Sequence, residues 1–251
     1  MMAVTLALFL VVGLVLGKAA DVFLTKSYRD ESPRSPLVRC QECRRRAAPR
    51  DAVPLIEALN LGRCTACSAR LPLRWLLLPI GCSAMAAACY LEFDDVGQAA
   101  VGAVFSTLLL ALVFTDIERR LLPDRIVLPG MVMAAGLAWL FPGMSALDTF
   151  YGGLVGLGIA VALILASLPF GAGAFGMGDA KVILLLGILL GPSSVVVAVF
   201  ASTLSAGLFA VVLLATRRRR FGDYLPHGPF LVMGGLIGLL WGTEIWDWYV
   251  R

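Results

Sequence analysis

Residues 173–181 read GAFGMGDAK and separate two long apolar runs of the chain. Glycine is a poor helix former, so this stretch predicts a break in a helix. Non-helical backbone at membrane depth is tolerated only where protein or water surrounds it, so the break also predicts a cavity. Asp179 lies at the expected start of the next helix. An ionisable side chain so close to hydrocarbon is costly and indicates a functional site by default.

A second acid, Asp116, occurs in the stretch FTDIERRLLPD, residues 114–124, directly after another apolar run. Two carboxyl groups forced together in a partly dry site cannot both ionise easily. One keeps its proton while the other can activate a water molecule, which is the arrangement of aspartic proteases. We therefore expect Asp116 and Asp179 to form a catalytic pair that hydrolyses peptide bonds at a membrane surface.

Three residues around Asp179 are candidates for a supporting role. Gly176 and Gly178 would let the chain approach a partner backbone closely. Lys181 would either stabilise a carboxylate or face the lipid headgroups. A phosphate-binding glycine loop is the competing interpretation of this stretch, but no Walker pattern of lysine and serine or threonine follows it. In the other acidic stretch, we expect Asp124 to be the N-cap of the next helix.

The composition indicates an all-α protein that crosses a membrane several times. Of its 251 residues, 59% are hydrophobic and 15% are charged, and the mean hydropathy is +0.87. With about 20 apolar residues for each span, we predict about eight transmembrane helices. They lie near residues 3–22, 75–91, 98–115, 126–141, 149–169, 180–191, 193–215 and 229–248. The sixth is short, so we expect it to be tilted, sunk in a thinned bilayer, or joined irregularly to the seventh at Gly191 and Pro192.

The distribution of charge predicts the orientation of these helices. No basic region precedes the first segment, so we expect a retained span over residues 1–23 and not a signal peptide. If the loop after it is cytoplasmic, every lysine and arginine except Arg251 falls on the inner side, as the positive-inside rule requires. The turns assigned to the outside carry carboxylates instead, namely Glu92, Asp94, Asp95 and Asp148. Both candidate catalytic acids are then expected at the cytoplasmic face.

Residues 24–74 form a polar region that is too small for a large hydrophobic core and needs a staple. The motifs CQEC and CTAC within it provide four thiolates, at Cys40, Cys43, Cys64 and Cys67. Two such pairs close a tetrahedral zinc site with all four positions filled, which is the structural kind. Four unrelated cysteines or an iron centre are the alternatives. We therefore predict a small zinc-binding cytoplasmic domain in the first loop.

Several other features are predicted to be structural. Cys82 and Cys89 lie within one predicted span, so we expect them to pack as small apolar residues. The glycines of the fifth span are expected to allow close helix packing; they are Gly152, Gly153, Gly156 and Gly158. The arginine run 217–220 is expected to anchor the seventh span at anionic headgroups. His227, the only histidine, cannot build a metal site or a catalytic triad by itself.

The order of the motifs along the chain resembles that of one known family. The segments TDIERRLLPD, GMGDAK and LPHGPFLVMGG occur together with the paired CxxC motifs, as in the type IV prepilin peptidases, a GxGD class of aspartic membrane proteases. The resemblance extends over nearly the whole chain. It implies that Asp116 and Asp179 are the catalytic aspartates, that the four cysteines bind zinc, and that residues 75–251 form the membrane protease core.

The resemblance also implies a substrate, a cofactor and a location. Members of the family remove the short basic leader of prepilins or pseudopilins at the cytoplasmic face of the bacterial inner membrane. Many then N-methylate the new terminus with S-adenosylmethionine. The expected partners are a substrate helix and the lipid bilayer, with no nucleic acid, and no oligomeric state is predicted. The alternatives are another GxGD intramembrane protease without methyltransferase activity, and an ion-coupled transporter whose two carboxylates bind ions.

Overall fold

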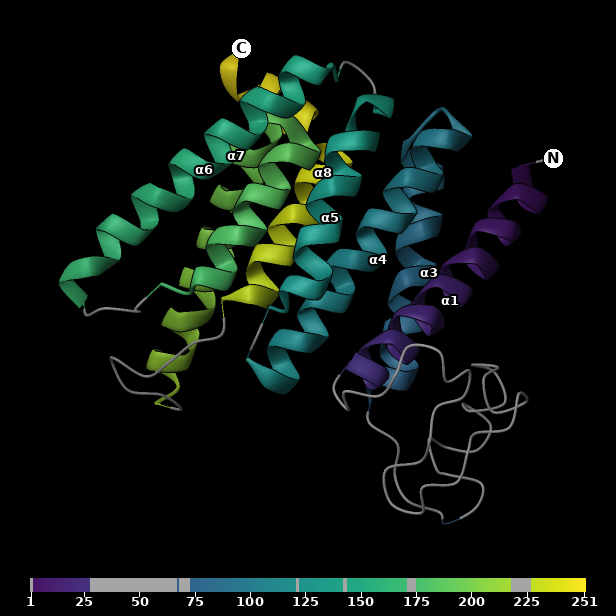
Figure 1. Ribbon diagram of the computed structural model, residues 1–251, viewed down its shortest axis with the longest axis horizontal. Helices are drawn as coiled ribbons and strands as arrows, with labels where there is room; N and C mark the ends of the chain where they lie inside the picture. Colours follow the sequence, from purple (N-terminus) through teal and green to yellow (C-terminus); the bar gives the residue numbers. More distant parts are fainter. Residues whose placement is uncertain are drawn as a thin grey trace. The chain divides into compact units, whose positions relative to one another are not determined.

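The computed structural model describes residues 2–27, 67, 73–120, 122–141, 144–170, 175–217 and 227–251. Within these ranges all regular structure is helical, and Figure 1 shows its course. The α-helices are α1 (Met2–Ser27), α3 (Arg74–Glu92), α4 (Val96–Arg119), α5 (Asp124–Leu137), α6 (Ala146–Ser167), α7 (Met177–Ala215) and α8 (Gly228–Val250). The 3-10 turns η2 (Ala138–Leu140) and η3 (Leu168–Phe170) follow α5 and α6. The all-α prediction is confirmed.

The helices have the length and surface of membrane spans. Six of the described helices are long and apolar enough to cross a bilayer, namely α1, α3, α4, α6, α7 and α8. One face of α7 exposes Phe200 (67%), Leu204 (61%) and Leu208 (66%). Such a continuous apolar face is unfavourable in water and suited to lipid. The chain is therefore a multi-pass membrane protein, as predicted.

The chain divides into two compact units, Met1–Phe114 and Thr115–Arg251. The boundary lies inside α4, so the last turn of α4 belongs to the second unit together with α5 to α8. In the first unit, α1 approaches α3 closely. A Cβ atom added at Gly13 would lie 2.5 Å from the Cα atom of Ser83. Cys82 and Cys89 of α3 are 0% exposed, so their predicted packing role is confirmed.

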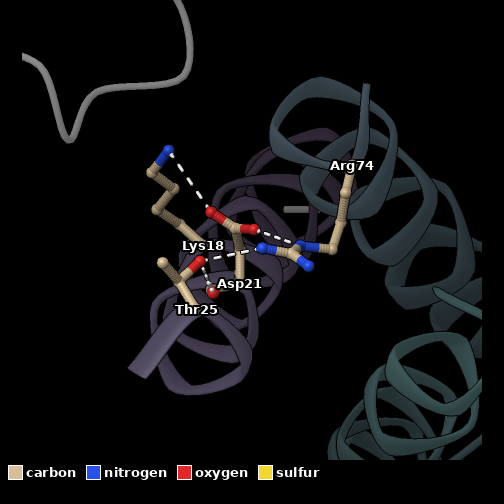
Figure 2. Close-up of polar contacts among 4 residues, drawn as sticks. All are labelled: Lys18, Asp21, Thr25 and Arg74. Atoms are coloured by element: carbon tan, nitrogen blue, oxygen red, sulfur yellow. Dashed lines mark hydrogen bonds and ion pairs between the residues drawn. The ribbon is translucent and has the colours of Figure 1, made fainter. Parts of the chain in front are cut away.

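A buried cluster of charges joins the C-terminal half of α1 to the start of α3, as Figure 2 shows. Arg74 donates from Nε to Asp21 Oδ1 at 2.7 Å and from Nη2 to Thr25 Oγ1 at 2.8 Å. Lys18 Nζ lies 3.9 Å from Asp21 Oδ2 and 4.2 Å from the centroid of the Trp75 ring. Asp21 is 0% exposed and Arg74 is 3% exposed. Because charges so far from water are tolerated only when paired, this cluster fixes α1 against α3.

In the second unit, α7 is interrupted at Gly191. At 1.5 Å per residue, a straight helix of its 39 residues would be about 58 Å long, far more than a hydrocarbon core of about 30 Å. Gly191 has φ +77° and ψ 178°, a backbone conformation that residues other than glycine rarely adopt. The predicted irregular joint at Gly191 and Pro192 is therefore confirmed.

The contacts with α8 show that α7 reverses direction at this joint. Before Gly191, successive residues of α7 contact α8 at increasing residue numbers. After Gly191, successive residues of α7 contact α8 at decreasing residue numbers. The pairs before the joint are Gly235 with Leu186 and Gly238 with Leu190. The pairs after the joint are Gly234 with Ser202, Gly238 with Ala198 and Gly242 with Ser194. The first half of α7 therefore runs parallel to α8 and the second half antiparallel, so α7 is a helical hairpin.

Glycines also bring α6 against the first half of α7. A Cβ atom added at Gly152 would overlap the carbonyl oxygen of Gly187, and one at Gly156 would lie 2.8 Å from the carbonyl oxygen of Ile183. The predicted packing role is confirmed for these two glycines. It is wrong for Gly158, where an added Cβ would meet no atom of the described residues within 4 Å. Residues on one face of a helix are three or four positions apart, whereas Gly158 is only two positions after Gly156. Gly158 therefore lies on the opposite face of α6.

Candidate active site

Asp116 is buried in the last turn of α4. Its exposed fraction is 5%, whereas the next residue, Ile117, is 59% exposed. We expected Asp116 just beyond the helix, but α4 continues one turn further and ends at Arg119. Arg120 then turns the chain with φ +53° and donates its backbone N–H to the Asp116 carbonyl oxygen at 2.8 Å. Asp116 Oδ2 accepts no hydrogen bond from the described protein atoms.

Asp179 lies in the first turn of α7. The N-cap of this helix is Gly176, in extended conformation with φ −72° and ψ 129°. A Cβ atom added at Gly176 would lie 3.1 Å from Asp179 Oδ2, so the carboxyl group folds back over the N-cap. The Asp179 side chain is half-buried and within electrostatic range of Asp116. The two acids, distant in sequence, thus lie at the same end of the second unit, near enough for their charges to interact.

Gly228, the first residue of α8, lies directly against the Asp116 carboxyl group. A Cβ atom added there would overlap Asp116 Oδ2 and would lie 2.7 Å from Cγ. A larger residue at this position would require the Asp116 carboxyl group to shift. The N-terminus of α8 also places the positive end of its helix dipole beside Asp116. Sequence reasoning missed Gly228, although the proline that follows it is a common signal of a helix start.

Lys181 contacts an acid of the α4–α5 region, and not a catalytic candidate. Its Nζ lies 2.6 Å from Asp124 Oδ1, and the side chains are 38% and 53% exposed. Asp124 is the first residue of α5 and Pro123 occupies the N-cap position, so the predicted capping role of Asp124 is wrong. Its carboxylate turns to Lys181 instead. This ion pair holds the start of α7 to the start of α5.

Gly178 packs against the connection between α4 and α5. A Cβ atom added at Gly178 would lie 3.1 Å from Leu122 Cβ. The chain around Asp179 thus approaches a side chain of this connection closely. Together with the Lys181 ion pair, this contact fixes the first turn of α7 relative to the end of α4 and the start of α5.

A pair of rings joins the segments that precede α7 and α8. The ring centroids of Phe175 and His227 are 6.3 Å apart with an interplanar angle of 58°, within the usual range for aromatic contacts. His227 is the N-cap of α8 and makes no side-chain capping hydrogen bond. Burial lowers the pKa of His227 below 6.5, so the ring is neutral at pH 7. Sequence reasoning did not identify Phe175 at all.

The predicted zinc ligands lie mostly outside the described residues. Of the four cysteines, Cys67 is described and exposed, whereas Cys40, Cys43 and Cys64 fall in the ranges that the structure does not describe. Within the described ranges no group of three or more His, Cys, Asp or Glu side chains could hold a metal ion. The zinc site stays a prediction.

Comparisons with known proteins agree on one family. The model described as the type IV leader peptidase family matches residues 103–211, which include both candidate acids. The model described as the bacterial peptidase A24 N-terminal domain matches residues 11–93.

Three similar curated proteins share the name prepilin leader peptidase/N-methyltransferase. The protein from Pseudomonas putida is 32% identical over 84% of this chain and 74% of its own length. The protein from Pseudomonas aeruginosa is 29% identical over 86% of this chain and 75% of its own, and that from Bacillus subtilis is 26% identical over 98% of both. No solved structure matches the chain significantly. The extent of these matches shows that the chain belongs to the type IV leader peptidase family.

Proposed function

We propose that this protein is a membrane aspartic endopeptidase that removes the basic leader of type IV prepilins or pseudopilins. The observation that supports the proposal is that the buried Asp116 and the half-buried Asp179 lie at one end of the second unit, Asp116 against the start of α8 and Asp179 over the start of α7, within electrostatic range of each other. Membership of the leader peptidase family supports the substrate class, as does the name that the similar proteins share.

In the proposed mechanism, a water molecule between the two carboxyl groups is the nucleophile. One carboxylate acts as general base on this water, while the other, protonated, polarises the scissile carbonyl. The roles exchange when the leaving amine takes up a proton. The helix dipoles of α7 and α8 stabilise a negative charge shared by the pair. Proton transfer of this kind usually contributes about 10² to 10⁴ in rate.

We also propose that the site faces the cytoplasm. The end of the second unit that carries the two acids also carries Arg119, Arg120 and Lys181, whereas the capping box at the start of α6 places Asp148 at the opposite end. An excess of basic residues marks the cytoplasmic side. An apolar substrate helix could then enter from the lipid with its basic leader in the cytosol. We propose eight crossings, in which the α7 hairpin counts as two and the short α5 as one.

A second activity and a structural metal complete the proposal. The name of the similar proteins includes N-methyltransferase, so we propose that the new N-terminus is methylated, with S-adenosylmethionine as the methyl donor. Cys40, Cys43, Cys64 and Cys67 would hold a structural zinc ion in a domain over residues 24–74. This domain would lie between the first helix, residues 1–23, and the protease core, residues 75–251.

The test incubates the purified full-length protein with a prepilin and a methyl-labelled donor, and measures leader removal and N-terminal methylation separately. Asp116→Asn and Asp179→Asn should each reduce cleavage by about 10² to 10⁴ or more. Asp148→Asn is the matched control, because it removes a carboxylate from the other end of the unit. Retained cleavage in both single variants would exclude the dyad. Cleavage without methylation by the wild type would favour a GxGD protease without transferase activity.

A further inference from the structure

Two helices start beside the two candidate catalytic acids, and each start is preceded by a ring. Phe175 directly precedes Gly176, the N-cap of α7 over which the Asp179 carboxyl group folds. His227 directly precedes Gly228, which lies against the Asp116 carboxyl group. The two rings contact each other at a centroid distance of 6.3 Å. Each ring is thus one residue away from the backbone that adjoins an acid.

The other contacts at this end bind α7 to different neighbours. The Lys181–Asp124 ion pair and the contact of Gly178 with Leu122 fix the start of α7 against α5 and the connection before it. The contact between Phe175 and His227 fixes it against α8. Since α8 in turn adjoins Asp116 through Gly228, the contact between α7 and α8 constrains the position of Asp179 relative to Asp116 in addition to the contacts through Leu122 and Asp124.

On the basis of the proposed function, we propose that His227 is a positioning residue for the catalytic pair. Its ring, held against Phe175, sets the spacing between the starts of α7 and α8 and thereby the separation of the Asp179 and Asp116 carboxyl groups. His227 does not act on the substrate in this account, and it is not a general acid or base.

The surroundings of His227 explain why packing and not charge carries this role. The imidazole of His227 makes no capping hydrogen bond to α8, so the role of the ring does not depend on capping. Burial keeps the imidazole neutral at pH 7. The adjoining helix ends carry the acids Asp116 and Asp179. They also carry the basic residues Arg119, Arg120 and Lys181. A neutral ring of similar size should therefore replace histidine.

The experiment measures kcat and KM for prepilin cleavage in full-length variants. His227→Ala should lower kcat by about 10- to 100-fold, because a misplacement of catalytic groups by roughly 1 Å has that effect. KM should stay within about threefold, since the contact is not with substrate. His227→Phe keeps a ring against Phe175 and should retain most of the wild-type kcat. Phe175→Ala should behave like His227→Ala, and the double alanine variant should be no slower than either, because both remove one contact.

A second aromatic contact between α7 and α8 supplies the matched control. The rings of Phe209 and Phe230 lie 5.3 Å apart, and neither residue is next in sequence to Gly176 or Gly228. Phe209→Ala should leave kcat unchanged. The proposal is wrong if His227→Ala keeps the wild-type kcat, if His227→Phe loses as much as His227→Ala, or if Phe209→Ala loses as much as either. Should His227→Ala fail to fold, Phe175→Ala and His227→Phe give the same decision. Absence of cleavage by the wild type would instead contradict the proposed function itself.

Discussion

Replacing Arg74 by methionine should destabilise the first unit by about 3 kcal/mol. The change keeps most of the side-chain volume but removes the guanidinium that donates to Asp21 at 2.7 Å, while Asp21 stays 0% exposed. Breaking a buried ion pair by removing one partner typically costs about 3 to 5 kcal/mol. The lower end applies here because Lys18 Nζ remains 3.9 Å from the second carboxylate oxygen.

The buried thiols of α3 provide the assay. Cys82 and Cys89 are 0% exposed, so they react with an alkylating probe only when the first unit opens. In detergent micelles, thiols that react in the folded state are blocked first, and labelling of the remaining thiols is then followed with time. A loss of about 3 kcal/mol corresponds to a labelling rate roughly 150-fold higher in Arg74→Met.

A double-mutant cycle separates the charge pairing from the packing. Asp21→Asn combined with Arg74→Met leaves no unpaired carboxylate, so the double variant should label within about tenfold of the wild type. Lys26→Met, which removes a charge from the last turn of α1 outside the cluster, should label at the wild-type rate. Equal rates for Arg74→Met and Lys26→Met would refute the reasoning, and so would a double variant as fast as Arg74→Met alone.

Gly228→Ala places a Cβ atom against the Asp116 carboxyl group, so leader cleavage should fall by about 100-fold. Gly158→Ala meets no atom within 4 Å in the part of the chain that the structure describes, so it should cleave normally. Equal activity of the two variants would contradict the close contact at Gly228. Because the Lys181–Asp124 pair is 38% and 53% exposed, Asp124→Asn should lower the free energy of unfolding by less than about 1 kcal/mol in chemical denaturation. Burial lowers the pKa of His227 below 6.5, so the unfolded chain binds a proton at higher pH than the folded chain does. Its contribution to stability is complete above pH 6.5 and is lost as the pH falls below that value, and thermal unfolding of His227→Phe should lack this component. An unchanged pH dependence in that variant would exclude the burial effect.

The sequence was sufficient to predict an all-helical membrane protein and to place Asp116 and Asp179 at helix ends. Apolar length determines where spans form, and an acid at the end of such a run stands out because hydrocarbon excludes charge. The joint at Gly191 was predictable because glycine followed by proline cannot continue a regular helix. Local signals of this kind lie within a few residues of one another along the chain.

The partners of the acids could not be predicted in the same way. The fit of Gly228 against Asp116 joins the first residue of α8 to the last turn of α4, and such a contact leaves no periodic pattern in either segment. Asp124 was assigned to capping because acids favour helix starts, but its carboxylate pairs with Lys181 of α7 instead. The contact between Phe175 and His227 likewise becomes visible only after the two helices are placed.

The place of Gly228 at the start of the final helix has a consequence for biosynthesis. Asp116 and Asp179 both leave the ribosome before α8 does. A nascent chain therefore carries both acids before Gly228 lies against Asp116. If the two acids are the proposed catalytic pair, their surroundings are complete only once α8 has inserted. A chain truncated before Gly228 should therefore hold both carboxyl groups and show no leader cleavage.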